Sequence, residues 1–143
     1  MTIALTPRLI VPASRDAIAF YVAALGATEV SCMSSPKGVV VHAEIEIGGA
    51  RLMLVDADPE WGNHPPSEVG SPVILCLTCD DPDATCAAAV AHGAEVVYPI
   101  ADRFYGDRDG RIRDPFGHLW ILRRTIREMT VEEIQKGVDD FGL

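Results

Sequence analysis

The feature that most constrains the fold is an internal repeat. Each half of the chain shows the same order of expected elements: strand, helix, strand, strand, strand. When the halves are offset by 67 residues, identical residues meet at the ends of the two expected helices: Asp16 with Asp83, Ala17 with Ala84, Ala24 with Ala91, Gly26 with Gly93, and Ala27 with Ala94. One element order present twice predicts an α+β fold of two tandem β-α-β-β-β modules.

The first module is expected within residues 1–57. Residues 4–12 are predicted to be extended, Ser14 to cap a helix, and Gly26 to end it. The inward side of this helix is predicted from apolar residues at helical spacing: Ala17, Ile18, Tyr21, Val22 and Leu25. Residues 28–33 are predicted to form a short strand before a turn at 34–38.

Two alternating strands follow, joined by a turn at Gly48 and Gly49. One face of the first is predicted to hold Val41, Ala43, Ile45 and Ile47, and the other Val40, His42, Glu44 and Glu46. In the second strand, one face is predicted to hold Leu52 and Leu54, and the other face Arg51, Met53 and Val55. The helix must cover the apolar face, so the opposite face carries an unusual set of charged groups: His42, Glu44, Glu46 and Arg51.

Residues 58–71 are predicted to be a linker, rich in Pro, Gly, Ser and acids, whose one large apolar side chain is Trp61. The second module is expected at 72–124. Asp81 is predicted to cap its helix, which carries Pro82 in the first position and ends at Gly93, with Cys86, Ala89 and Val90 inward. Residues 125–143 are predicted to be a helical tail that begins at a capping box, Thr130 to Glu133.

The second module is expected to close with a strand at 95–100, a loop that carries Phe104 and Tyr105, and a hairpin turning at Asp114-Pro115-Phe116-Gly117. Asp107, Arg108 and Asp114 are expected to form a salt-linked loop that holds the hairpin shut. His118 is expected to brace the same hairpin.

Charge and cysteine usage exclude several classes of protein. The formal charge of −9 argues against nucleic acid as a partner, because phosphate backbones bind basic surfaces. No apolar run is long enough for a membrane helix, and the N-terminus lacks the pattern of a signal peptide, so a cytoplasmic protein is expected. Cys76 and Cys79 form a C-x-x-C string inside an expected strand, which favours reduced thiols over a redox or zinc motif.

Four stretches together resemble the vicinal-oxygen-chelate superfamily, and more closely its PhnB-like, glyoxalase-like branch. They are TPRLIVPASRDAIAFYVAALGA, VHAEIEIGGARLMLVD, SPVILCLTCDDPDA and YGDRDGRIRDPFGHLW. The superfamily includes glyoxalase I, bleomycin-resistance proteins and extradiol dioxygenases. The resemblance implies two modules whose sheets curl into a cup with the helices outside, completed in a homodimer.

The resemblance also implies a divalent metal held by His, Gln or Glu from the first and fourth strands of each module. The matching positions here are Thr6, Met53, Ile74 and Ile121, which do not supply such ligands. No cofactor is therefore expected at the family's metal positions. A relocated metal on His42 and Glu44, with Glu46 or Cys76 as a third ligand, is one alternative. The other is that His42 and Glu44 pair with Arg8, Arg51, Arg111 or Arg113.

Three functional hypotheses follow. The first is a binding protein for a small planar or hydrophobic molecule, with these candidate ligand-binding residues: Arg8, Arg51, Met53, Trp61, Cys76, Phe104, Tyr105 and Ile121. The second is a lyase, isomerase or dioxygenase of the same superfamily. It would use a relocated metal or an acid–base pair, in which Glu44 is the base and His42 or an arginine stabilises an oxyanion. The third is a scaffold that only dimerises.

Overall fold

The repeated module is confirmed by the computed structural model, which describes residues 2–68 and 70–142. The first module consists of β1 (Arg8–Val11), α1 (Ser14–Leu25), β2 (Thr28–Ser34), β3 (Val40–Ile47) and β4 (Ala50–Asp56). The second consists of β5 (Ile74–Thr78), α2 (Pro82–Ala91), β6 (Glu95–Asp102), β7 (Asp107–Arg113) and β8 (Leu119–Thr125). The linker contains a single turn of 3-10 helix, η1 (Pro59–Trp61), and the chain continues into α3 (Val131–Phe141).

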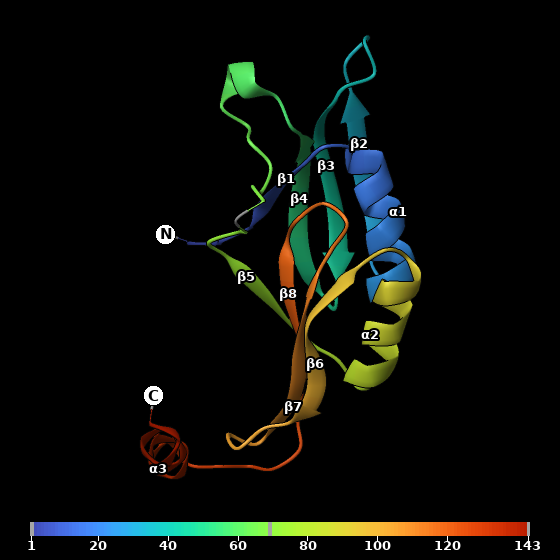
Figure 1. The fold of residues 1–143 in the computed structure, drawn as a ribbon. Coiled ribbons are helices and arrows are strands. Elements are labelled where there is room, and N and C mark those ends of the chain that lie inside the picture. The colour runs from blue at the N-terminus through green and yellow to red at the C-terminus, as the bar shows by residue number, and fades with distance from the viewer. Residues whose placement is uncertain (1, 69, 143) are drawn as a thin grey trace.

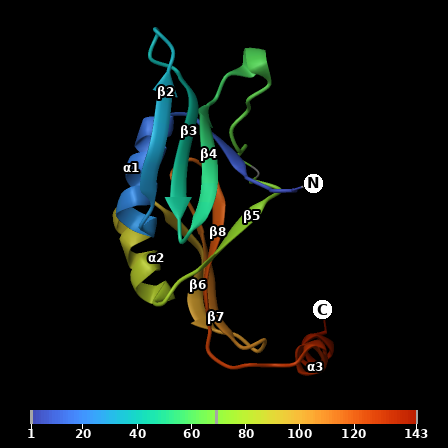
Figure 2. The ribbon, with the colours of Figure 1, turned by 180° about the vertical axis from the view of Figure 1, so that it is seen from behind.

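The two modules build equivalent but separate sheets. Their strand orders are β1-β4-β3-β2 and β5-β8-β7-β6. In each sheet the first and fourth strands of the module pair in parallel, and the remaining pairs are antiparallel. Figures 1 and 2 show α1 and α2 side by side along one flank of the two sheets, with α3 standing away from the body near the ends of β6 and β7. The fold is therefore α+β with two sheets that do not close on each other.

The helices cover one face of each sheet, as the alternation predicts. Ala43 and Ile45 of β3 and Leu54 of β4 are fully buried beneath α1, and Ile112 and Leu122 are equally buried in the second module. His42 and Glu44 lie on the opposite face and remain partly exposed. We call this side, away from α1, the open face of the first sheet.

The predicted alternation fails at the start of β3. Val40 is 2% exposed and Val41 is 49% exposed, which reverses the expected faces of these two residues. The reason is a β-bulge, since Met33 of β2 pairs with His42 and the next residue, Ser34, pairs with Val40. The extra residue on β3 shifts the phase of the strand by one, so Val41 points to the open side.

The start of α1 also differs from the prediction. Ser14 is the first helical residue and makes no side-chain cap; the Asp56 carboxylate at the end of β4 accepts hydrogen bonds from the backbone N–H groups of Ser14 (2.7 Å) and Val40 (2.9 Å). A distant strand thus supplies the cap that a local serine was expected to supply. In the second module Asp81 accepts a hydrogen bond from the N–H of Ala84, as predicted.

Two helical valines predicted to face inward are exposed. Val22 is 43% and Val90 is 45% exposed. In α1 the buried arc includes Phe20, whose ring meets Phe116 of the second module at 6.1 Å. The buried side of α1 therefore includes Phe20, which contacts the other module, and excludes Val22. The spacing of apolar residues within one helix does not indicate a contact with another module.

The Asp114 carboxylate connects the modules. It is 3% exposed and accepts hydrogen bonds from the Tyr21 hydroxyl of α1 (2.5 Å) and from the Trp120 indole N–H (2.9 Å). Its other oxygen accepts the backbone N–H groups of Phe116 and His118, both at 2.9 Å, which fixes the β7–β8 turn. Burial and the adjacent carboxylate raise the pKa of Tyr21 well above its ordinary value, so the tyrosine stays a hydrogen-bond donor.

The expected salt-linked loop of Asp107, Arg108 and Asp114 is not formed, because Asp107 and Arg108 lie in β7 and form ion pairs with other residues. Asp107 pairs with Arg123 at 2.8 Å, and Arg108 pairs with Asp83 and Asp102 at 2.8 and 2.9 Å. Asp114, in contrast, is held by neutral donors. The Nε2 atom of His118 lies 2.9 Å from the carbonyl oxygen of Ile10, so this histidine joins the hairpin to β1.

Among the residues that the structure describes, no helix combines the length and the apolar character needed to cross a membrane.

We expect Asp114→Asn to lower the free energy of unfolding by about 2–4 kcal/mol, because the amide nitrogen would face donors that now meet a carboxylate oxygen. Asp83→Asn is the matched control, since Asp83 forms a solvent-exposed ion pair and its loss should destabilise the protein much less than Asp114→Asn. Urea unfolding followed by circular dichroism measures both. Equal losses for the two variants would contradict the role assigned to Asp114.

Candidate functional site

The open face of the first sheet brings together five of the residues singled out from the sequence. Met53 of β4 lies between Arg8 of β1 and Glu44 of β3 in the strand register. Glu44 is 3.6 Å from the guanidinium of Arg51 and 4.0 Å from Nε2 of His42. The alternative in which Glu44 pairs with Arg51 is thus present in the structure. These groups are a quarter or more exposed, so the ion pairs contribute little to stability.

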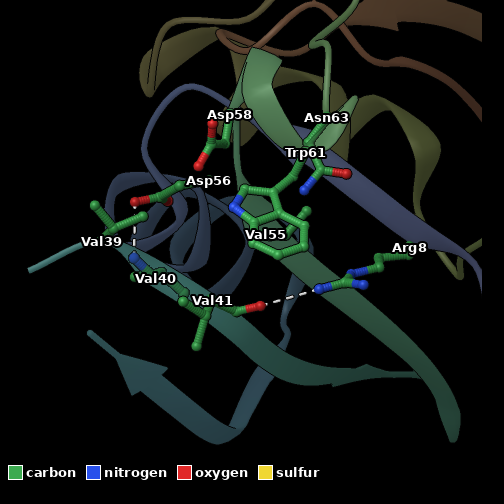
Figure 3. A pocket seen from close by; sticks show the side chains of 9 residues that line it. All are labelled: Arg8, Val39, Val40, Val41, Val55, Asp56, Asp58, Trp61 and Asn63. Atoms are coloured by element: carbon green, nitrogen blue, oxygen red, sulfur yellow. Dashed lines mark hydrogen bonds between the residues drawn. The ribbon is translucent and has the colours of Figure 1, made fainter.

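A pocket lies beside these residues, where β1, β3 and β4 meet the linker. Its volume is about 460 Å³. Its walls are shown in Figure 3 and consist of Arg8, Val39, Val40, Val41, Val55, Asp56, Asp58, Trp61 and Asn63. We call it the Trp61 pocket. It unites two candidate ligand-binding residues, Arg8 and Trp61, that are 53 positions apart in the sequence.

The linker holds Trp61 over the pocket through its own turn chemistry. The Asp58 carboxylate accepts the N–H of Glu60 at 3.1 Å and so caps η1. The backbones of Asp58 and Asn63 form an isolated antiparallel bridge that closes the turn. The indole nevertheless remains 81% exposed, so a fixed backbone presents a large aromatic surface to solvent.

The second sheet places Cys76 and Ile121 opposite each other in its parallel pair. A separate pocket of about 330 Å³ lies where the modules meet, and both Arg51 and Cys76 line it. Arg111 of β7 lies beside Ile121 in the register, and its guanidinium is 5.0 Å from the centre of the Tyr98 ring. The second sheet therefore carries Arg111 next to the apolar side chain of Ile121 and the thiol of Cys76.

Phe104 and Tyr105 lie away from both of these pockets, at the end of the second module. Phe104 stacks on Phe141 of α3 with ring centres 5.2 Å apart. The Tyr105 hydroxyl donates a hydrogen bond to Asp109, and burial together with this carboxylate raises the pKa of the tyrosine. Within a single chain, neither residue meets the Trp61 pocket. Their role as ligand contacts stays a prediction.

The family's metal positions do not fit a divalent ion. Thr6 precedes β1, Met53 lies between Arg8 and Glu44, and Ile74 and Ile121 offer no donor atom. A cationic guanidinium opposite Met53 also disfavours a second cation there. Within residues 2–68 and 70–142, no three His, Cys, Asp or Glu side chains are grouped in a way that could hold a metal ion.

The fold and the arrangement of these modules define the class of protein. The chain belongs to the Glyoxalase/Bleomycin resistance protein/Dioxygenase superfamily, whose sequence profile matches residues 4–122. An uncharacterized protein of Mycobacterium bovis is 39% identical over 143 residues, covering 97% of this chain and 94% of that protein.

Solved structures agree with this assignment. The X-ray structure of a gene product of Arabidopsis thaliana has a TM-score of 0.71 and 30% identity, covering 87% of this chain and 100% of that one. A PhnB protein from Bacillus cereus has a TM-score of 0.68 at 21% identity, covering 84% and 98% of the two chains, and shows the shared fold.

Several residues of the Trp61 pocket are absent from the sequence-based predictions. Val41 was placed on the helix side of its strand, and the bulge that exposes it leaves no mark in the hydrophobic pattern. Val39 and Asn63 lie in turns, where alternation does not assign a face. Val55 could have been found, since alternation along β4 places it on the same side as Arg51 and Met53.

Proposed function

We propose that this chain binds a small planar or hydrophobic molecule in the Trp61 pocket. The observation that carries the proposal is the exposed indole of Trp61 beside a pocket lined by four valines. A volume of about 460 Å³ lies within the range of small-molecule sites. Covering an indole and its neighbours would contribute roughly 4 kcal/mol of hydrophobic free energy, which offsets part of the entropic cost of binding a ligand.

The proposal includes a homodimer. The open face of the first sheet leaves Met33 52% and Val41 49% exposed, and Trp61 of the neighbouring linker is 81% exposed. The two sheets of one chain are separate, so a second copy would be needed to enclose this face and complete a cup. Sedimentation equilibrium should give twice the 15.4 kDa mass of the chain at micromolar concentration. A stable monomer would contradict the dimer and leave the pocket as a property of one chain.

The binding proposal requires no metal, because the pocket walls offer valine side chains, an indole, one guanidinium, two carboxylates and one amide. Recognition in such a pocket rests on stacking and on a few polar groups. We also place Arg51, Met53, Cys76 and Ile121 at the outer part of the cup, where a larger ligand would reach them.

We expect the uncharged fluorescent dye N-phenylnaphthylamine to bind the wild-type protein and to quench Trp61 by stacking on it. Trp61→Ala should weaken binding at least about tenfold, because the variant loses the stacking surface. The second tryptophan, Trp120, is 2% exposed and cannot stack on the dye, so the dye's own emission is used to follow binding to both proteins. Dye titration by fluorescence measures both effects. Unchanged affinity in Trp61→Ala would contradict the site.

The alternative function is an enzyme of the same superfamily that uses His42 and Glu44, which lie 4.0 Å apart on the open face. Glu44 is also 3.6 Å from the Arg51 guanidinium, so one of its carboxylate oxygens already has a partner within the chain. Elemental mass spectrometry of protein purified without chelator separates the two functions. The binding proposal predicts much less than one metal ion per chain. A near-stoichiometric metal that is lost on His42→Ala with Glu44→Ala would favour the enzyme.

A further inference from the structure

Arg8 lacks a carboxylate partner in a chain with an excess of acids. The sequence has 21 Asp and Glu residues for 12 Lys and Arg. Four arginines on the faces turned away from α1 and α2 have an acidic partner: Arg51, Arg103, Arg113 and Arg123. Within the described part of the chain, Arg8 has no carboxylate within 4.0 Å. Five other basic side chains of the described residues share this property: Arg15, Lys37, Arg111, Arg124 and Arg127. Arg8 differs from them because it lines the Trp61 pocket, where a ligand can reach it.

The contacts of Arg8 leave most of its donors free. One terminal nitrogen, Nη2, donates to the backbone carbonyl of Val41 at 3.0 Å. This bond directs the guanidinium along the wall of the Trp61 pocket, as the dashed line in Figure 3 shows. The guanidinium has five N–H donors in a rigid fork, which suits bidentate binding of a carboxylate, sulfonate or phosphate group.

The two acids of the pocket, Asp56 and Asp58, make its two ends electrostatically different. Both oxygens of Asp56 already accept backbone N–H groups, those of Ser14 and Val40. Asp58 caps η1, and in Figure 3 the Trp61 indole lies between Asp58 and Arg8. An anionic group is therefore repelled from the Asp58 end of the pocket and attracted to the Arg8 end, while a flat apolar body lies against Trp61.

We propose that the natural ligand of the Trp61 pocket is an aromatic or apolar acid whose anionic group binds the Arg8 guanidinium. This inference rests on the proposed function and names the ligand class of the same site. Arg8 is the single basic side chain among the pocket walls, which also carry Asp56 and Asp58, so an anionic group can be bound only at the Arg8 end. Among residues 2–68 and 70–142, Arg111 also has no carboxylate within 4.0 Å, but its guanidinium lies against Tyr98 in the other module.

Two dyes with one aromatic skeleton test the proposal. Anilinonaphthalene sulfonate carries a sulfonate, and N-phenylnaphthylamine carries no charge. In Arg8→Gln we expect affinity for the sulfonate to fall about tenfold or more and affinity for the uncharged dye to change less than about twofold, because only the charged hydrogen bonds are removed. Arg8→Lys should fall between the wild type and Arg8→Gln for the sulfonate, since it keeps the charge without the fork.

The control variant is Arg124→Gln, which removes the same charge from β8, where Arg124 contacts the backbone oxygen of Asp80. It should leave both affinities within about twofold, because a distant surface charge is screened. Equal weakening of the two dyes in Arg8→Gln, no weakening of either, or an equal loss of sulfonate affinity in Arg124→Gln would overturn the anion site alone. Failure of the wild type to bind either dye would overturn the pocket and the anion site together.

Discussion

The position of the second module depends on one buried carboxylate. Asp114 accepts four hydrogen bonds, two that close its own turn and two from large aromatic side chains, Tyr21 and Trp120. Tyr21 belongs to the first module, so the same group that shapes the hairpin also fixes it against α1. A buried charge without partners is strongly unfavourable, which makes any other arrangement of these two elements expensive. As a result, α1 and α2 pack against each other on the covered faces of the two sheets, and the open faces point to solvent.

A second carboxylate shapes the site in a comparable way. Asp56 at the end of β4 satisfies the first turn of α1 and the start of β3. The bulge next to it turns Val41 outward, toward Arg8 and Trp61. The Trp61 pocket thus depends on the hydrogen bonds by which Asp56 joins the end of β4 to the starts of α1 and β3. Its walls come from β1, β3, β4 and the linker.

The sequence was sufficient for the repeated module, the strand faces over most of β3 and β4, and the open-face position of Met53, because period-two alternation and turn residues act locally. It was insufficient wherever a partner came from elsewhere in the chain. The local sequence predicts that Ser14 caps α1, but the cap is the Asp56 carboxylate. Helical spacing predicts that Val22 is buried, but Phe20 is buried instead, in contact with Phe116. The candidate residues Arg8 and Trp61 were identified from residue type, but their meeting in one pocket depends on the path of the linker. The contact between Phe104 and Phe141 of α3 likewise depends on a distant segment, which the residues around Phe104 do not indicate.

The central claim is that a ligand lies between Trp61 and Arg8. A crystal structure of the protein with anilinonaphthalene sulfonate tests it directly, because it shows both where the aromatic body lies and which way the anion points. The account predicts a ring stacked on the Trp61 indole and a sulfonate oxygen at about 3 Å from the Arg8 guanidinium. A dye bound elsewhere with the Trp61 pocket empty, or bound in it with the sulfonate toward Asp58, would contradict the account.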